Sequence, residues 1–303
     1  MTVLTDFQSR SSALFPNMEL RFHEPLSKHT SFRIGGCAEV IVFPKNTEEL
    51  SEVLKKYALL DCKPVILGAG TNVLAPDEGI NGAVICLKDS LDGMERLDDT
   101  AIQVMAGVSM TRAAVFAAAQ GLSGLEFAHG IPGTVGGGVY MNAGAYGGEI
   151  SQVCESVTVM ERDGTAHQMT GEQMEFSYRH SALEETGAVV VSAVFRLTPK
   201  PTEQIKATMK ELISKRSSSQ PLDLPSAGSA FKRPVGGYAA ALIDQAGLKG
   251  FQIGGAAVST KHAGFVVNLG GATAKDVRAL LAQVAERVYA ASGIRLEPEI
   301  RIW

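Results

Sequence analysis

The sequence predicts a protein of mixed helices and strands, divided into two or three subdomains. Its 303 residues reach the upper limit of what a single hydrophobic core usually serves. Residues 38–43 and 64–67 have the apolar character of strands, and a helical pattern over 46–57 lies between them. Apolar alternation at 157–160 and 189–197 predicts further sheet strands. Strands and helices therefore occur throughout the chain, beginning with an α/β unit in the first ninety residues.

Local signals place the elements of the N-terminal half. The first twenty residues lack clear periodicity, and we expect an amphipathic helix among them. Asn46 with Glu49 three residues later is typical of a capping box, so a helix should begin there and run to about Tyr57. Further along, 102–106 is expected to be a strand and 110–121 an alanine-rich helix.

The C-terminal part begins after a plausible boundary at 199–201, which contains two prolines. Helices are expected over 202–216 and 238–246, followed by a last helix that ends at about Ser292. Thr273 with Asp276 opens that helix, and Gly293 supplies its C-terminal cap. Residues 296–303 are expected to form a terminal strand.

Composition excludes several classes of function. The chain has 28 Lys and Arg against 32 Asp and Glu, a net charge of −4, which argues against nucleic-acid binding. Its densest apolar stretch, 113–119, is too short to cross a bilayer, and no signal peptide is apparent. The four cysteines (37, 62, 86 and 154) are scattered without a CxxC pair or clustered histidines. We therefore expect no metal, no disulfide framework, no membrane insertion, and reduced, mostly buried thiols in a cytoplasmic protein.

Two glycine loops are the strongest functional signal before any family is considered. Gly68 and Gly70 follow a strand, but the third glycine of a dinucleotide fingerprint falls on Val73, and no helical pattern follows. A Walker A loop is absent as well. Residues 121–148 contain ten glycines in 28 positions, a density that we expect to exclude a helix. Two such loops could clamp a dinucleotide through backbone N–H groups, whereas tight turns alone explain only the first loop.

Six motifs then carry a family resemblance, in the family's order along the chain. They are K-H-T-S-F-R-I-G-G at 28–36, L-G-A-G-T-N-V-L at 67–74, G-I-P-G-T-V-G-G at 130–137, Y-R at 178–179, G-S-A-F-K at 228–232 and L-E-P-E-I-R at 296–301. Together they resemble the UDP-N-acetylenolpyruvoylglucosamine reductase (UDP-N-acetylmuramate dehydrogenase) family. The short stretch after 178–179 contains no aromatic residue and resembles the branch that lacks a tyrosine-bearing lid.

The resemblance implies an α+β fold of the vanillyl-alcohol-oxidase or PCMH type, with two FAD-binding subdomains and a third α+β substrate-binding domain. The expected ranges are 1–88, joined by a C-terminal strand at 297–303, then 89–200 and 201–296. FAD should be non-covalent, because no histidine stands in the first glycine loop where related oxidases attach it. The implied cofactor-binding residues are Gly68, Gly70, Thr71, Asn72, Val73, Gly133, Thr134, Gly136, Gly137 and Asn142.

The implied reaction passes hydride from NADPH through flavin N5 to UDP-N-acetylglucosamine enolpyruvate, giving the peptidoglycan precursor UDP-N-acetylmuramate. In the family pattern Ser229 donates the proton, Arg179 pairs with the substrate carboxylate, and Glu299 acts with the serine. The implied substrate-binding residues are Tyr178, Lys232 and Arg233. A monomer is expected.

Each assignment has a plainer alternative. An isolated loop serine is usually a turn or cap residue, and an arginine near a strand end is usually a surface charge. Period-two alternation puts Glu297 and Glu299 on one face, which could equally be a solvated acidic edge. His129 and His180 are expected to be hydrogen-bonded structural histidines. Two competing functions are an FAD-dependent sugar or hydroxy-acid oxidase and a nucleotide-sugar-binding regulator without catalysis.

Overall fold

A computed structural model describes residues 5–303, and contacts between residues group them into two compact units. Unit 1 comprises the described residues up to Phe22, then Glu39–Ala69 and Gly82–Lys215; unit 2 comprises His23–Ala38, Gly70–Asn81 and Arg216–Trp303. Two contact units do not define three functional subdomains, so the boundaries at 88, 200 and 296 remain a prediction.

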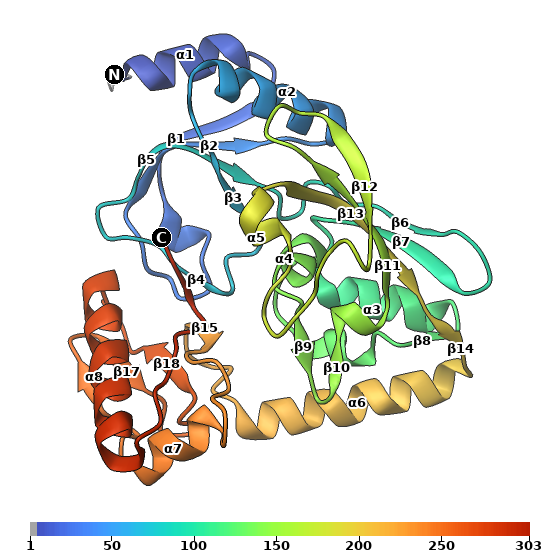
Figure 1. The fold of residues 1–303 in the computed structure, drawn as a ribbon. Helices are drawn as coiled ribbons and strands as arrows, with labels where there is room; N and C mark the ends of the chain where they lie inside the picture. The colour runs from blue at the N-terminus through green and yellow to red at the C-terminus, as the bar shows by residue number, and fades with distance from the viewer. Residues whose placement is uncertain (1–4) are drawn as a thin grey trace. The chain divides into compact units, whose positions relative to one another are not determined.

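The first sheet contains the strand–helix–strand pattern expected near the N-terminus. Its strand order is β1 (Glu19–Pro25), β2 (Cys37–Phe43), β5 (Ile80–Cys86) and β3 (Val65–Leu67), and β3 runs parallel to β5. The helices α1 (Asp6–Leu14) and α2 (Thr47–Leu59), labelled in Figure 1, belong to unit 1. The Asn46 side chain accepts a 2.8 Å hydrogen bond from the Glu49 N–H and caps α2, which confirms the expected helix start. The Glu49 carboxylate accepts from the Lys45 N–H at 2.7 Å, one residue before the cap.

Unit 1 also contains a five-stranded antiparallel sheet. Its order is β12 (Ala166–Thr170), β11 (Cys154–Met160), β13 (Val189–Arg196), β7 (Ala101–Met105) and β6 (Met94–Arg96). The strand expected at 189–197 is confirmed, but its first seven residues are all buried, so both of its faces are covered and not the single face that alternation implies. The remaining elements of unit 1 are α3 (Met110–Ala119), β8 (Leu122–Ser123), η2 (Glu126–Gly130), α4 (Val135–Tyr140), β9 (Gly144–Ala145), β10 (Gly148–Glu149), η3 (Ile150–Gln152), α5 (Leu183–Thr186) and β14 (Thr198–Pro199).

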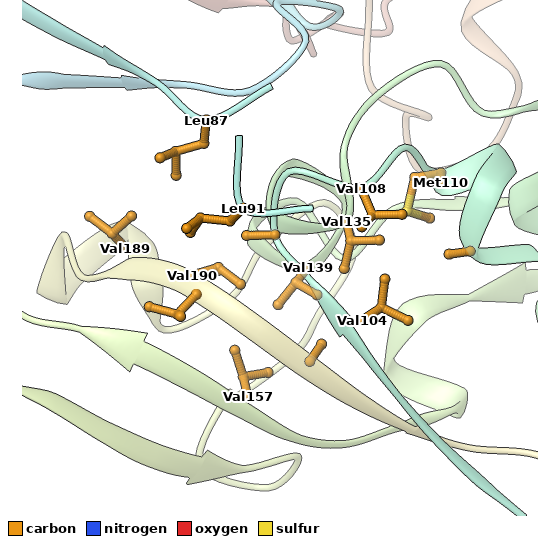
Figure 2. Packing of buried hydrophobic residues seen from close by; sticks show 14 of the residues in the cluster. Leu87, Leu91, Val104, Val108, Met110, Val135, Val139, Val157, Val189 and Val190 are labelled. Carbon is orange, nitrogen blue, oxygen red and sulfur yellow. The ribbon is translucent and has the colours of Figure 1, made fainter. Parts of the chain in front are cut away.

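The expectation that the glycine-rich stretch excludes a helix is wrong. Residues Val135–Tyr140 form α4, which includes three consecutive glycines. Val135 and Val139 are fully buried on one face of this helix, and Figure 2 shows them among Val104, Val157 and Val190 of the neighbouring strands. Tertiary burial of that face therefore outweighs the poor helix propensity of glycine.

Close packing gives two of these glycines a physical reason. A Cβ built on Gly138 would lie 2.6 Å from the Met110 sulfur, and one on Gly136 would lie 3.0 Å from the Ala106 Cβ. Any larger residue would push α4 away from these neighbours. Glycine here permits close approach rather than a turn.

Unit 2 contains a four-stranded antiparallel sheet with its own core. The order is β15 (Ser226–Ser229), β18 (Phe265–Asn268), β17 (Ala256–Val258) and β16 (Gln252–Ile253). The long helix α8 (Ala274–Ser292) packs against β16, β17 and α7 (Ala239–Gln245) (Figure 1). The capping box of Thr273 and Asp276 and the left-handed Gly293 confirm both predicted ends of α8. Another helix, α6 (Thr202–Ser219), runs from one unit into the other along the chain.

The C-terminal strand is shorter than expected. Only β19 (Arg301–Ile302) is a strand, and it pairs in parallel with β4 (Val73–Leu74). Before it, Pro298 makes a single antiparallel bridge with Phe231. Proline has no N–H to donate to a ladder, which limits pairing at this position. The short η1 helix (Leu26–Lys28) completes the elements of unit 2.

Candidate active site

Arg179 stands at the tip of a tight turn in unit 1. The backbones of Ser177 and His180 exchange two hydrogen bonds of 3.2 Å, leaving Tyr178 and Arg179 at the turn. Arg179 has a φ of +58°, a left-handed conformation that is rare for a bulky residue. Its guanidinium lies 5.0 Å from the centre of the half-exposed Tyr178 ring and donates to the Gly144 carbonyl at 3.2 Å. Arg179, which the family pattern pairs with the substrate carboxylate, therefore lies in a strained turn.

Asn142, expected in the cofactor set, lies fully buried behind that turn. Its amide nitrogen donates to the Ser177 carbonyl at 3.0 Å, and its amide oxygen accepts from the Ser151 N–H at 2.9 Å. Both polar ends of the side chain therefore contact protein.

The two predicted cofactor loops meet within unit 1 at Gly68. A Cβ there would lie 2.5 Å from the Thr134 hydroxyl oxygen, so only glycine permits this approach. In the second loop, Val135 and Gly136 give their N–H groups to the carbonyls of Val108 and Ala106. These two N–H groups are therefore already engaged by backbone.

Other groups in or beside the second loop have weak hydrogen bonds or none among the described residues. The Gly137 N–H reaches the Thr134 hydroxyl at 3.4 Å, close to the limit of a hydrogen bond. Gly133 has a φ of +145°. Directly before the loop, the buried Nδ1 of His129 has no hydrogen-bond partner among the described residues. The expectation of a hydrogen-bonded His129 is wrong at this atom. The His180 ring lies 3.5 Å from the Glu184 carboxylate, and its structural role stays a prediction.

The rest of the first loop belongs to unit 2. Gly70 has a φ of +63°, and a Cβ there would meet the His29 carbonyl at 2.1 Å. Ser31 donates its backbone N–H to the Gly70 carbonyl at 3.0 Å and its hydroxyl to the Ser226 carbonyl at 2.6 Å. Thr71 follows Gly70 and is partly buried. Ser31 thereby ties this loop to β15, a role that sequence analysis missed.

Asn72 connects the same loop to the C-terminal segment. Its amide nitrogen donates to the Glu299 carbonyl at 3.2 Å, and its own carbonyl accepts from the Arg301 N–H at 2.9 Å. Val73 then begins β4, which pairs with β19. A predicted cofactor loop and a predicted catalytic residue are thus joined within unit 2.

Asp77 connects the segment after β4 to the start of α8, a contact that the sequence did not predict. Its carboxylate accepts from the N–H groups of Ala274 and Lys275, at 2.7 and 3.0 Å. These are the first two residues of α8, whose N–H groups have no partner inside the helix. No local pattern could have revealed this cap, because the two donors stand 197 and 198 positions from the acceptor in the sequence.

Ser229 and Glu299 lie on neighbouring backbones. Ser229 is exposed at the end of β15, and the next residue, Ala230, accepts a 2.9 Å hydrogen bond at its carbonyl from the Glu299 N–H. The partner segments continue with a 2.8 Å bond from the Lys232 N–H to the Glu297 carbonyl. Residues 230–232 and 297–299 therefore run antiparallel beside each other.

The two glutamates differ in their surroundings. The Glu297 carboxylate forms a 2.5 Å ion pair with Lys232, and its side chain is 71% exposed. Glu299 is half-buried. Glu297 therefore pairs with Lys232. The family pattern assigns Lys232 to substrate binding. Arg233, another predicted substrate residue, lies 3.9 Å above the exposed ring of Tyr238.

The His262 imidazole is connected to the Ser229 segment through Gly264. The His262 Nδ1 accepts a hydrogen bond from the Gly264 N–H at 3.1 Å, and the Gly264 carbonyl accepts from the Ala230 N–H at 2.8 Å. Burial lowers the pKa of His262 below its usual 6.5, because the charged ring would lose its hydration.

The residues present fit a bound FAD. Gly68 and Thr134 bring the two glycine loops together with no larger side chain between them. The weakly bonded Gly137 N–H and the unpartnered His129 Nδ1 are polar groups that a ligand could satisfy. Within residues 5–303 there is no cluster of three or more metal-ligating side chains, and no helix is long and apolar enough to span a membrane.

Comparison with known proteins defines the class first. Residues 38–170 match a family described as "FAD binding domain", so the chain carries a flavin-binding domain. A solved alkyldihydroxyacetonephosphate synthase is 16% identical, with a TM-score of 0.50 over 65% of this chain and 41% of that one, a likeness of fold alone. This agrees with the PCMH-type α+β fold expected from the sequence.

The particular family follows from the other matches. Residues 220–303 match "UDP-N-acetylenolpyruvoylglucosamine reductase, C-terminal domain". Relatives of that name from Agathobacter rectalis and Streptococcus pneumoniae are 45% and 44% identical, each over 95% of both chains. The solved reductase from Thermus caldophilus is 36% identical, with a TM-score of 0.77 over 95% of this chain and 99% of that chain. This chain belongs to the UDP-N-acetylenolpyruvoylglucosamine reductase family, and the predicted family and fold are confirmed.

Proposed function

We propose that this chain reduces UDP-N-acetylglucosamine enolpyruvate to UDP-N-acetylmuramate, using non-covalently bound FAD and NADPH. The proposal includes a cytoplasmic, monomeric enzyme that supplies peptidoglycan precursors. Membership of the reductase family supports it, and the observation that carries the mechanism is the backbone pairing of the Ser229 and Glu299 segments in unit 2.

Within unit 1, the FAD would be held by Gly68 and the groups beside it: Thr134, Gly137 and His129. The expected cofactor residues at 70–73 belong to unit 2, and their role stays a family-based expectation. When bound, FAD supplies hydride transfer from NADPH to an activated double bond. The missing Cβ atoms would let the backbone approach the cofactor closely, and the weakly bonded Gly137 N–H would favour a negative phosphate.

Arg179 would bind the substrate carboxylate. Reduction of the enolpyruvyl double bond adds one hydride and one proton, and negative charge builds beside the carboxylate between these additions. A guanidinium fork matches a planar carboxylate in two parallel hydrogen bonds. The Tyr178 ring beneath the Arg179 guanidinium supports its position through a cation–π contact.

Ser229 would deliver the proton. Its hydroxyl is exposed at the end of a strand, where it can approach a substrate carbon. A serine is a weak acid, so it can donate only to a strongly basic carbon and must be reprotonated afterwards. Glu299, on the adjacent backbone, would take part in that relay, whereas the Glu297 ion pair with Lys232 keeps Glu297 outside it.

The test separates the two half-reactions in the Ser229→Ala variant. Flavin reduction by NADPH should proceed at the wild-type rate, because it needs no proton from Ser229. Flavin reoxidation by the enolpyruvyl substrate should slow about 10²–10⁴-fold, the usual contribution of a positioned general acid. Ser226→Ala is the matched control in the same strand, because Ser226 accepts from Ser31 through its backbone carbonyl. Equal slowing of both halves in Ser229→Ala would instead assign Ser229 a structural role.

A further inference from the structure

Three hydrogen bonds connect residues 140–144, at and just after the C-terminal end of α4, with the turn that carries Arg179. They involve every second residue of each segment, and each comes from a different side chain. The Ser181 hydroxyl donates to the Tyr140 carbonyl at 2.7 Å, the Asn142 amide nitrogen donates to the Ser177 carbonyl at 3.0 Å, and the Arg179 guanidinium donates to the Gly144 carbonyl at 3.2 Å. All of these residues lie in unit 1. The turn is therefore fixed at its start, its tip and its end by one neighbouring segment.

Asn142 is the central contact of this arrangement. Its side chain is completely buried, and its φ of +40° is left-handed, which asparagine tolerates better than other residues with a Cβ. Its amide oxygen is held by the Ser151 N–H, which orients the amide nitrogen toward Ser177. A buried amide with both ends bonded is costly to disturb, because removal of one partner leaves the other without a hydrogen bond.

Arg179 needs such support. A bulky residue at φ +58° costs of order 1–3 kcal/mol and persists only where its surroundings determine the backbone. The Ser177 carbonyl, which accepts from Asn142, lies two residues before Arg179. The Gly144 carbonyl, which accepts from the guanidinium, lies two residues after Asn142. Asn142 is thus connected to both the backbone and the side chain of Arg179.

We propose that Asn142 is a positioning residue that fixes Arg179 for the substrate carboxylate, and that it does not bind the cofactor. This proposal rests on the proposed function for its substrate. It replaces the family-based expectation that Asn142 belongs to the FAD site, because both polar ends of the amide already contact protein.

The main test is Asn142→Gly, which removes the amide but keeps a residue that adopts positive φ freely. The FAD dissociation constant, measured by flavin fluorescence, should change less than about twofold. Reoxidation of the reduced enzyme by the enolpyruvyl substrate should fall on the order of 10²-fold at low substrate, as expected for a misplaced contact. Gln168→Ala, which removes an exposed side chain of β12 that donates to the Ser156 hydroxyl, is the control and should change neither quantity.

A double-mutant cycle with Arg179→Ala distinguishes positioning from general damage. If Asn142 acts through Arg179, the two effects are coupled. In the Arg179→Ala background, Asn142→Gly should therefore lower the reoxidation rate by less than about twofold. Equal factors in both backgrounds would overturn the proposal. So would a raised FAD dissociation constant with normal reoxidation of the loaded fraction, which would return Asn142 to the cofactor site.

A second readout does not depend on turnover. In the FAD-loaded protein, amide hydrogen exchange of peptide 175–182 should accelerate in Asn142→Gly and, to a smaller extent, in Asn142→Ser. Unchanged exchange in a folded variant would refute the proposal. If the wild type is not reoxidised by the enolpyruvyl substrate, the proposed function fails, and the exchange result still decides whether Asn142 holds the turn.

Discussion

The three consecutive glycines of α4 should respond differently to alanine, and Gly137 gives the most informative case. A Cβ on Gly137 would find only the Thr134 hydroxyl oxygen, at 3.6 Å, so the folded protein has room for it. Alanine is the better helix former by about 0.5–1 kcal/mol. We therefore expect Gly137→Ala to stabilise the protein by about 0.5 kcal/mol, because α4 is only six residues long and realises the lower end of that range.

The flanking glycines should show the opposite sign. At Gly136 the new Cβ would lie 3.0 Å from the Cβ and 3.3 Å from the carbonyl oxygen of Ala106, neither of which can rotate away. Overpacking of this kind costs typically about 1–3 kcal/mol, which exceeds the helix gain. At Gly138 the contact is the Met110 sulfur at 2.6 Å, and Met110 is itself buried, so its side chain has little space to move into.

The assay is thermal unfolding of the three variants with FAD removed and then at rising FAD concentrations. Without FAD, Gly137→Ala should melt about 1–2 °C above the wild type, and Gly136→Ala several degrees below it. The FAD dependence of the midpoint gives the dissociation constant by linkage. In Gly137→Ala this constant should rise about tenfold, or 1.4 kcal/mol, because the methyl group occupies the surface that the cofactor approaches. A Gly137→Ala variant that melts below the wild type, or one that binds FAD normally, would refute the reasoning.

Three further predictions follow. Glu299→Gln should chiefly slow flavin reoxidation by the enolpyruvyl substrate in stopped flow, whereas Glu297→Gln should change substrate affinity, because it releases Lys232 from its ion pair; the reverse result would move the catalytic assignment to Glu297. Acid precipitation should release the yellow FAD into the supernatant, and colour retained in the pellet would show covalent attachment. Burial lowers the pKa of His262, so as pH falls below 6.5 the unfolded state takes up the proton before the folded state does. The contribution of His262 to the free energy of unfolding should therefore be fully present above pH 6.5 and be lost as pH decreases through the lowered pKa. In urea titrations, His262→Gln should remove this dependence of the free energy of unfolding on pH.

The sequence predicted elements whose signals are local. The capping box at Thr273, the glycine at 293 and the alternating apolar residues that predicted β13 all lie within a few residues of the structure they determine. The helix α4 could not be predicted in this way, because its glycines are required by Met110 and Ala106, which no local pattern reveals. The terminal strand was overestimated because pairing is limited around Pro298.

The candidate site likewise contains residues that local motifs predict and contacts that they do not. Motifs predicted Arg179, Ser229 and Glu299 as site residues, and the segments that carry two of them, Ser229 and Glu299, pair through their backbones in unit 2. The supporting contacts of Ser31, Asn72 and Asp77 could not be predicted, because each joins segments far apart in the sequence. Such joints are set by tertiary structure and leave no spacing to recognise.

The most direct measurement is an anaerobic titration of the purified wild-type protein, followed by flavin absorbance. NADPH should bleach the flavin, and one equivalent of UDP-N-acetylglucosamine enolpyruvate should then restore it while forming UDP-N-acetylmuramate. If the reduced flavin ignores the enolpyruvyl substrate and is restored rapidly only by oxygen, the chain is an oxidase and the proposed reaction is wrong.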